Sequence, residues 1–379
     1  MNDDFKRKLE LYDKDEMTSE EKKEFEKEMD AREEQWMKSG LDKTKQRKIL
    51  RASKWKARIG TALTAIPIIL LIMMASSFLT NLYYYGFSTG LSENYSRSQK
   101  LADVISFSQL ITDPFADKYS ASSEVGAFFK MGVNTEIRKQ VGKEFYTVGE
   151  MDVNFFFSKM GVVERKYYGK DENLQAEFQH PSLLTEYNSD SASEWVRLEM
   201  LPEGTVSTAF VTFNELMSTE KVFEVFQGKN LDLIWFPVDI PNEKEDYIPI
   251  SNIGFPNHPI FHNDDWTLTF RTEERSLFGS TVSEGRSSPG YEEGDVEMLH
   301  KQFKKTLDFL KDYQKEFNQI QVIYNDIQLT DVISYLEKNE ISHHGVVITG
   351  PTKEVLSLKE EEWVGAIQVD EVALWNWNN

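Results

Sequence analysis

The feature that most constrains this chain is a stretch of 27 residues, 59–85, that carries no charged side chain. Its middle, residues 66–74, reads Ile-Pro-Ile-Ile-Leu-Leu-Ile-Met-Met. A helix that rises about 1.5 Å per residue would extend roughly 40 Å over this length, enough to cross a hydrocarbon core of about 30 Å. Because no water in that core can satisfy the backbone, the stretch must be helical. The sequence therefore predicts one transmembrane helix, with a core helix of a soluble domain as the alternative.

The charges on either side of this stretch predict its orientation. Residues 41–58 hold eight basic side chains and one acidic one, whereas three consecutive tyrosines, residues 83–85, close the apolar run. Positive flanks stay in the cytoplasm, so we expect the N-terminus inside and the C-terminal domain outside, in a single-pass protein of the cell membrane. A cleaved signal peptide, with a small-residue site at 75–77, is the rival interpretation. Since 58 residues precede the apolar run, which is far longer than the n-region of a signal peptide, we predict an uncleaved anchor.

Charge and cysteine content restrict the partners and the chemistry of the rest of the chain. Residues 86–379 carry 48 acidic and 26 basic side chains, so that part repels nucleic acids and anionic lipid. The basic run at 41–58 is interpreted as a topology determinant attracted to inner-leaflet lipid, because no groove-reading motif accompanies it. The chain has no cysteine, which excludes disulfides, Cys-ligated zinc and thiol chemistry.

Two short helices are predicted before the anchor, each with one narrow apolar stripe on a charged surface. Phe5, Leu9 and Tyr12 recur at the i, i+4, i+7 spacing of one helix face. Thr18 followed by Glu21 has the capping-box pattern that starts a second helix.

The second helix places Phe25, Met29 and Trp36 on one narrow face. Two stripes this thin are too small to make a stable core, so either the helices fold back on each other weakly or the stripes bind a partner. Coiled-coil pairing, or solvation without a partner, is the alternative. Burying one large apolar side chain is worth about 1.5–3 kcal/mol, and we therefore favour a partner. The candidate contact residues are Leu9, Tyr12, Phe25, Met29 and Trp36.

The outer part is predicted to be an α+β (mixed α/β) domain. Residues 206–240 have the order strand, short helix capped by Ser218, strand, which is a compact β-α-β pattern. Apolar runs at 346–349 and 364–374 predict two more strands. We divide the chain into residues 1–58 (cytoplasmic), 59–85 (transmembrane), 86–200 (stalk and first outer subdomain) and 201–379 (C-terminal outer domain).

Polar composition and caps predict the remaining elements. Residues 86–100 are rich in Ser and Asn, as a stalk would be, and residues 279–294 are rich in Gly and Ser, which indicates a mobile loop. Asp295 starts a predicted long helix whose apolar residues recur at helical spacing as far as Phe317. Thr330 is a candidate cap of a shorter helix. The fold of residues 100–200 is not predicted by these patterns.

No pattern of residues indicates catalysis. The densest group of possible metal ligands is His258, His262, Asp264 and Asp265. Imidazole and carboxylate could meet one divalent ion, but Asn-His-Pro and His-Asn-Asp-Asp are also ordinary turn sequences, and we favour a structural loop. His343 and His344 precede an apolar strand and are expected to pack or to face solvent. Residues 350–353, Gly-Pro-Thr-Lys, lack the spacing of a phosphate loop and predict a strand-to-helix turn. We expect no enzyme activity, no cofactor and no metal.

Several segments carry a resemblance to a known family. The chain resembles the membrane-anchored sigma factor regulators of Gram-positive bacteria, which have an N-terminal and a C-terminal regulator domain. The run Gly-Val-Val-Ile-Thr-Gly-Pro-Thr-Lys, from residue 345, is the most characteristic. Residues 90–200 contribute little to the resemblance. The similar segments are residues 11–29, 209–213, 234–238, 345–356 and 365–375.

The resemblance implies an anti-sigma factor that responds to envelope stress. Its cytoplasmic segment would hold an extracytoplasmic-function sigma factor at the lipid bilayer, away from RNA polymerase, with a second membrane regulator as a further partner and no nucleic acid. The chain departs from the zinc anti-sigma factors, because it lacks their His-x-x-x-Cys-x-x-Cys motif. Its grip must therefore depend on helix packing and charge. The alternatives are a signal-anchored extracytoplasmic enzyme and an envelope assembly protein.

Overall fold

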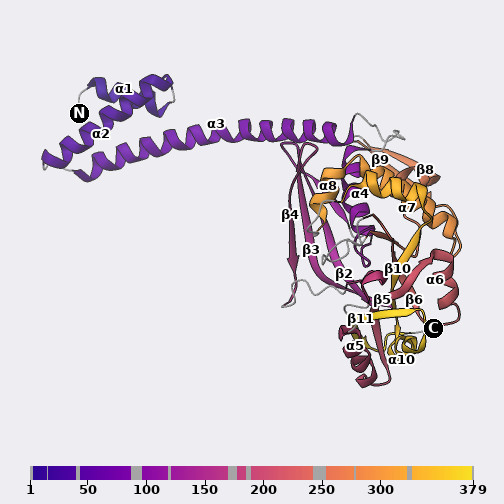
Figure 1. Cartoon of the computed structure of the whole chain (residues 1–379). Coiled ribbons are helices and arrows are strands. Elements are labelled where there is room, and N and C mark those ends of the chain that lie inside the picture. Colours follow the sequence, from indigo (N-terminus) through magenta and orange to yellow (C-terminus); the bar gives the residue numbers. More distant parts are fainter. Residues whose placement is uncertain are drawn as a thin grey trace. The chain divides into compact units, whose positions relative to one another are not determined.

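The structure, a computed structural model, describes most of the chain. Its described residues fall into two compact units, residues 1–79 and residues 80–379 (Figure 1). The described ranges are 3–14, 16–39, 43–86, 96–117, 121–169, 177–184, 189–241, 253–276, 279–321 and 327–377.

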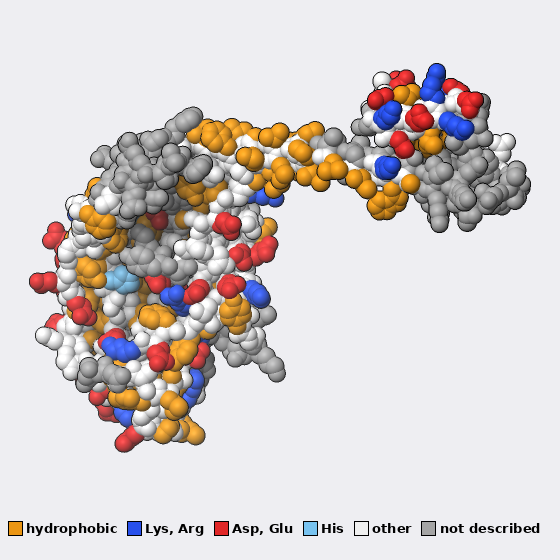
Figure 2. All heavy atoms as spheres, turned by 180° about the vertical axis from the view of Figure 1, so that it is seen from behind, with side chains coloured by type: hydrophobic (Ala, Val, Ile, Leu, Met, Phe, Trp, Pro, Cys, Tyr) orange, Lys and Arg blue, Asp and Glu red, His pale blue; other side chains and the backbone are white. Residues whose placement is uncertain are grey.

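The N-terminal unit consists of helices. Helices α1 (Asp3–Asp13) and α2 (Ser19–Ser39) precede α3 (Lys43–Tyr85), which contains both the basic run and the uncharged stretch and continues through Pro67. The segment Ala65–Tyr85, with a mean hydropathy of 2.0, is long and apolar enough to cross a membrane. Most side chains of this segment are exposed, among them Ile68, Leu71 and Met74 at 58%, 65% and 69%. Figure 2 shows hydrophobic side chains along the side of the helix that it presents. An apolar helix that protein covers only in its last turns is typical of a membrane span. The predicted helix is confirmed.

The second unit begins at Thr80, in the last turns of α3, and continues with a helix and an antiparallel sheet. Helix α4 (Arg97–Leu110) starts at a capping box formed by Ser96 and Gln99, and it buries much of its length. The stalk prediction is therefore wrong for residues 96–100, while residues 87–95 lie outside the described residues. The sheet has the order β1-β2-β3-β4. Its strands are β1 (Ser122–Val125), β2 (Lys130–Val141), β3 (Glu144–Phe156) and β4 (Lys159–Tyr167).

A second antiparallel sheet, of five strands, has the order β11-β5-β10-β6-β7. The predicted strand-helix-strand is confirmed as β5, α6 and β6, with Ser218 as the helix cap. However, β10 lies between β5 and β6 and pairs antiparallel with both, so the two strands of the pattern are not neighbours. The bounds are β5 (Thr205–Ser218), α6 (Thr219–Phe226), β6 (Asp232–Pro237), β7 (Gly254–Pro256), β10 (Ser342–Pro351) and β11 (Val364–Leu374).

A two-stranded hairpin replaces most of the predicted loop at 279–294. Strand β8 (Thr267–Ser276) pairs antiparallel with β9 (Gly279–Ser287) over nearly its whole length. The prediction failed because β9 is rich in Gly and Ser and has one large apolar residue, Val282, so its sequence lacks the usual strand signal. The strand is stabilised by its backbone hydrogen bonds to β8, and its small side chains contribute little.

Helices cover the sheets and join the strands. Asp295 caps α7, as predicted, but the long helix ends at Lys311, and Phe317 belongs to a separate helix. Gln328, and not Thr330, is the N-cap of α9. The helices are α5 (Ser189–Met200), α7 (Val296–Lys311), α8 (Gln314–Ile320), α9 (Leu329–Lys338) and α10 (Thr352–Ser357), with 3₁₀ turns at Pro181–Leu183, Asn263–Asp265 and Leu358–Glu360.

One hydrophobic core runs through this unit, on both sides of residue 200. Side chains of α4 and of the first sheet belong to the same buried cluster as those of β5, α7 and β10. Trp235, fully buried on β6, donates from its indole nitrogen to the Leu110 carbonyl oxygen of α4 at 3.1 Å. Lys139 of β2 forms ion pairs with Asp370 and Glu371 of β11 at 2.9 and 3.2 Å. The two predicted outer parts therefore pack as one body.

Candidate functional site

The candidate partner-binding site is the helical hairpin formed by α1 and α2. Phe5 lies over Phe25 with ring centroids 5.2 Å apart, and Tyr12 packs against the same ring at 5.6 Å. Leu9 and Met29 complete a cluster whose five members are at most 8% exposed. The two apolar stripes therefore cover each other, and the expectation that they are too few to form an internal core is wrong. Of the two alternatives, folding back is the one that the structure shows.

Polar contacts close the hairpin around this cluster. The Tyr12 hydroxyl donates to Glu26 at 2.6 Å, and the Lys8 ammonium lies 3.3 Å from Glu28. Arg32 pairs with Glu28 at 3.1 Å and stacks its guanidinium 4.4 Å from the centre of the Phe5 ring. Such a cation–π contact is typically worth about 0.5–1 kcal/mol at an exposed site. These contacts join the two helices along their length.

A capping box fixes where α2 begins. The Thr18 amide and hydroxyl donate to Glu21 at 2.8 and 2.7 Å, and the Glu21 amide donates back to the Thr18 hydroxyl. The backbone hydrogen bond from Thr18 lowers the pKa of the Glu21 carboxyl below its usual value. The pattern predicted this cap correctly, because it depends on residues only three positions apart.

The structure brings together four of the five predicted contact residues. Leu9, Tyr12, Phe25 and Met29 belong to the hairpin cluster. Trp36 lies on α2, but its side chain is outside the described residues. The predicted contact set omitted Phe5, although its spacing places it on the same stripe, and it missed the stacking Arg32 because cation–π pairing across helices has no local signal.

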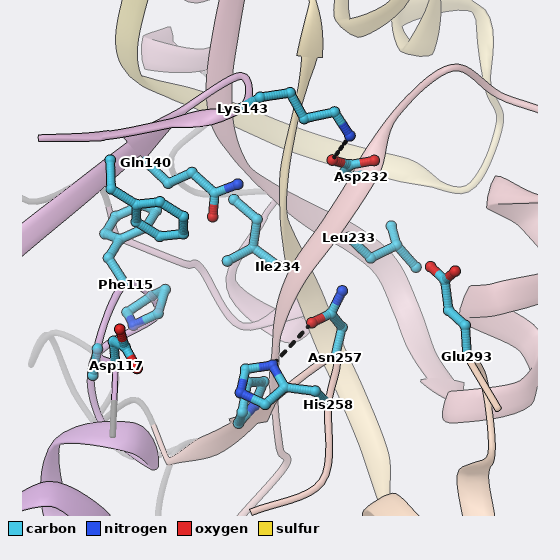
Figure 3. Close-up of a pocket in the computed structure, with 14 residues that line it drawn as sticks. Phe115, Asp117, Gln140, Lys143, Asp232, Leu233, Ile234, Asn257, His258 and Glu293 are labelled. Carbon is cyan, nitrogen blue, oxygen red and sulfur yellow. Dashed lines mark hydrogen bonds and ion pairs between the residues drawn. The ribbon is translucent and has the colours of Figure 1, made fainter. Parts of the chain in front are cut away.

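The second unit contains a pocket of about 550 Å³ between the two sheets (Figure 3). Lys143 and Asp232 form an ion pair on its wall, and His258 and Asn257 lie on another side, with the imidazole Nδ1 3.3 Å from the amide oxygen. Burial lowers the pKa of His258, and the charge of Asp117 opposes that effect. Among the residues that the structure describes, the lining contains both signs of charge and aromatic rings but no serine, threonine or cysteine. Its charged and amide side chains can hydrogen-bond a small polar molecule.

The predicted group of metal ligands is separated in the structure. His262 is buried, with Nε2 2.9 Å from the Thr306 hydroxyl. Lys305 pairs with Asp264 at 2.8 Å and with Asp265 at 2.7 Å, while His258 lines the pocket instead. Within the described ranges, no group of three or more His, Asp and Glu side chains is placed to hold a metal ion. The structural-loop interpretation explains these residues.

The two adjacent histidines pack inside the five-stranded sheet. His343 is completely buried, with Nδ1 2.8 Å from the Pro237 carbonyl oxygen and Nε2 2.7 Å from the Thr219 hydroxyl. Burial lowers the pKa of His343 to about 4 and that of His344, which is equally buried, to about 3. Both imidazoles are therefore neutral at physiological pH, and the packing interpretation is confirmed.

The Gly-Pro-Thr-Lys segment is a turn, as predicted. Strand β10 ends at Pro351 and α10 begins at Thr352. Gly350 is required there, because an added Cβ would lie 2.8 Å from the Leu231 side chain and 2.9 Å from the Asn230 carbonyl oxygen.

Comparison with known proteins identifies two matching family models. Residues 47–146 match the sigma factor regulator N-terminal model and residues 198–371 match the sigma factor regulator C-terminal model. The matches cover most of α3, strands β1 and β2 of the first sheet and nearly all of the five-stranded sheet, and they leave β4 and the α1–α2 hairpin outside. The chain is also 26% identical, over 394 residues that span both chains completely, to a Bacillus subtilis (strain 168) protein named probable anti-sigma-M factor YhdL. No solved structure matches the chain.

Proposed function

This chain belongs to the sigma factor regulator family, and from that membership we propose that it is a membrane-bound anti-sigma factor. It holds an extracytoplasmic-function sigma factor at the cytoplasmic face of the membrane through residues 1–58, and its outer unit responds to the state of the envelope. The observation that carries the proposal is the similarity, along its entire length, to a protein named as an anti-sigma factor.

The hairpin supplies the contact with the sigma factor. Its apolar cluster contains five buried side chains, which is a small core for two helices and therefore easily exchanged for contacts with another protein. We propose that α1 and α2 separate on binding and that Leu9, Tyr12, Phe25, Met29 and Trp36 re-pack on the partner. In the free protein the hairpin keeps Leu9, Tyr12, Phe25 and Met29 out of water, which prevents non-specific association.

Electrostatic attraction adds to this apolar contact. Residues 1–40 carry 14 acidic and nine basic side chains, which favours a basic partner and faster encounter with it. The following basic run, at the start of α3, is attracted to inner-leaflet lipid and keeps the hairpin on the cytoplasmic side. The outer unit offers the pocket beside Lys143 and His258 for a ligand or for a second membrane regulator.

The first test is capture followed by an affinity measurement. The full chain, purified from the membranes of its own cells, should bring an extracytoplasmic-function sigma factor with it. Phe25→Ala combined with Trp36→Ala should then weaken the affinity of the full chain for that sigma factor on the order of a hundredfold, because aromatic anchors dominate interfaces. The control is Lys23→Ala on α2, whose main effect should be on association rate and salt dependence. Capture of no sigma factor, or unchanged affinity in the double variant, would contradict the proposal.

A crosslink distinguishes an opening hairpin from a closed one. The chain has no cysteine, so Lys8→Cys with Glu28→Cys introduces a unique pair where the native side chains meet across the helices. A flexible thiol crosslinker between them should reduce sigma-factor affinity, and the uncrosslinked double variant should bind as the wild type does. If the crosslinked chain binds equally well, the outer faces of the hairpin make the contact and the stripe residues do not.

A further inference from the structure

The last turns of α3 are held by two β-turns of the four-stranded sheet. The Tyr84 hydroxyl lies 3.0 Å from the Phe129 carbonyl oxygen, in the β1–β2 turn, and 2.6 Å from that of Phe157, in the β3–β4 turn. The Phe129 amide donates to the Thr80 hydroxyl at 2.9 Å. Tyr84 and Thr80 are fully buried in these contacts. Figure 1 shows the ends of β3 and β4 beside the last turns of α3. The two turns therefore lie where the apolar helix ends.

An aromatic cluster fills the same place. The rings of Phe129 and Phe157 stack with centroids 4.4 Å apart, and Tyr83 packs edge-on against both, at 5.8 and 5.2 Å. Phe128, Phe129 and Phe157 have positive φ angles, which are unusual for large side chains and are kept only where surrounding contacts enforce them. The backbone thus adopts an unfavourable conformation that holds phenylalanines at these two tips.

The tips also present apolar side chains to their surroundings. Phe128, Phe156 and Phe157 are 48%, 56% and 37% exposed. Lys130 and Lys159, both exposed, follow the two turns, and neither residues 126–131 nor residues 155–160 contain an acidic residue. In an outer part with 48 acids and 26 bases, a cationic, phenylalanine-rich surface is a local exception.

We propose that these two turns form a second membrane contact, in which Phe128, Phe156 and Phe157 enter the interface of the lipid bilayer at the outer end of α3. The inference rests on the membrane anchoring in the proposed function. Lipid is the expected partner of these turns because they are continuous with the membrane-spanning segment: both are hydrogen-bonded to Tyr84, in the last turn of the apolar segment Ala65–Tyr85. Lipid is also expected from composition, because aromatic rings favour the interface and lysines reach phosphate headgroups. The contact would fix the outer unit against the membrane surface.

Depth-dependent quenching tests this contact in the full chain. A single cysteine at Phe156→Cys, carrying an environment-sensitive fluorophore, is reconstituted into vesicles that contain only the purified protein, anionic phospholipid and nitroxide-labelled lipid. We expect a blue-shifted emission and strong loss of fluorescence. The matched control is Val162→Cys on β4 of the same sheet, which is 78% exposed and away from the turn, and it should be quenched little.

A third label separates this proposal from the one on which it rests. Leu71→Cys lies within the apolar segment and reports insertion of the anchor itself. If Leu71→Cys is quenched while Phe156→Cys and Val162→Cys behave alike, the anchor is inserted and the second contact is overturned. If Leu71→Cys is not quenched, membrane anchoring fails and the proposed contact fails with it. Lys130→Glu together with Lys159→Glu should reduce the quenching at Phe156→Cys, and an undiminished signal would remove the lysines from the contact.

Discussion

Buried histidines are expected to make the stability of this protein depend on pH. The His343 Nδ1–H donates to the Pro237 carbonyl oxygen, and its Nε2 lies 2.7 Å from the Thr219 hydroxyl, which in turn is 2.7 Å from His300 Nε2. With His343 neutral, its Nε2 accepts from the Thr219 hydroxyl. Burial is the main cause of the low pKa of both adjacent histidines, about 4 for His343 and about 3 for His344. An unfolded chain would return both to about 6.5.

The lowered pKa values predict loss of stability in acid. Below about pH 6.5 each histidine is protonated in the unfolded state but stays neutral in the folded state. The free energy of unfolding therefore falls by roughly 1.4 kcal/mol per pH unit for each histidine, until the pH reaches the pKa of the folded state. Asp113 opposes this, because burial raises its pKa to about 6 and the folded state takes up its proton first. Because the two histidines together outweigh Asp113, we predict a lower melting temperature at pH 5.0 than at pH 7.5, measured on the full chain in detergent.

Two variants test the assignment of this pH dependence. His344→Gln should make the pH slope of stability shallower by about 1.4 kcal/mol per pH unit, whatever its effect on absolute stability. Asp113→Asn should make the slope steeper, because it removes the opposing carboxyl group. Stability that is constant or rises on acidification would contradict the account.

At the scale of elements, sequence patterns predicted what depends on neighbours along the chain. The apolar helix, the Thr18 cap, the strand-helix-strand at 206–240 and the last strand at 364–374 were all predicted from local spacing. The position of β10 between β5 and β6 was not predicted, because strand order depends on residues more than a hundred positions apart. The Ser-rich residues before α4 were interpreted as a stalk, although Ser96 is a helix cap.

The hairpin shows the same limit at the candidate site. Spacing identified the residues of each stripe, but it could not show that one stripe covers the other, since that depends on the chain reversal between α1 and α2. The spacing of apolar residues identifies one face of a helix, but it does not identify the surface against which that face packs.

Removal of the central ring of the hairpin should release α1. Phe25 contacts both Phe5 and Tyr12, and replacing a buried Phe by Ala typically costs about 3–5 kcal/mol. A cluster of five side chains cannot absorb this loss, so backbone amides of α1 should exchange hydrogen much faster in Phe25→Ala. The control is Glu34→Ala, an exposed position of the same helix, which should leave exchange in α1 unchanged. Equal protection of α1 in the two variants would show that the cluster does not hold the hairpin.

At the scale of the whole molecule, one apolar helix connects two units of different character. The N-terminal unit has a small core, which suits a site that changes partners, whereas the second unit has an extensive core running through both sheets. The last turns of α3 belong to the second unit through Tyr84 and Thr80.

Transcription in cells tests the central claim most directly. The full chain and a variant that lacks residues 1–39 but keeps α3 are expressed at equal levels in the membrane, and transcription from a promoter that depends on the captured sigma factor is measured. We predict that the full chain represses this transcription and that the shortened, still anchored chain does not. Equal repression by both chains would contradict the account, because the helical hairpin would then not be what holds the sigma factor.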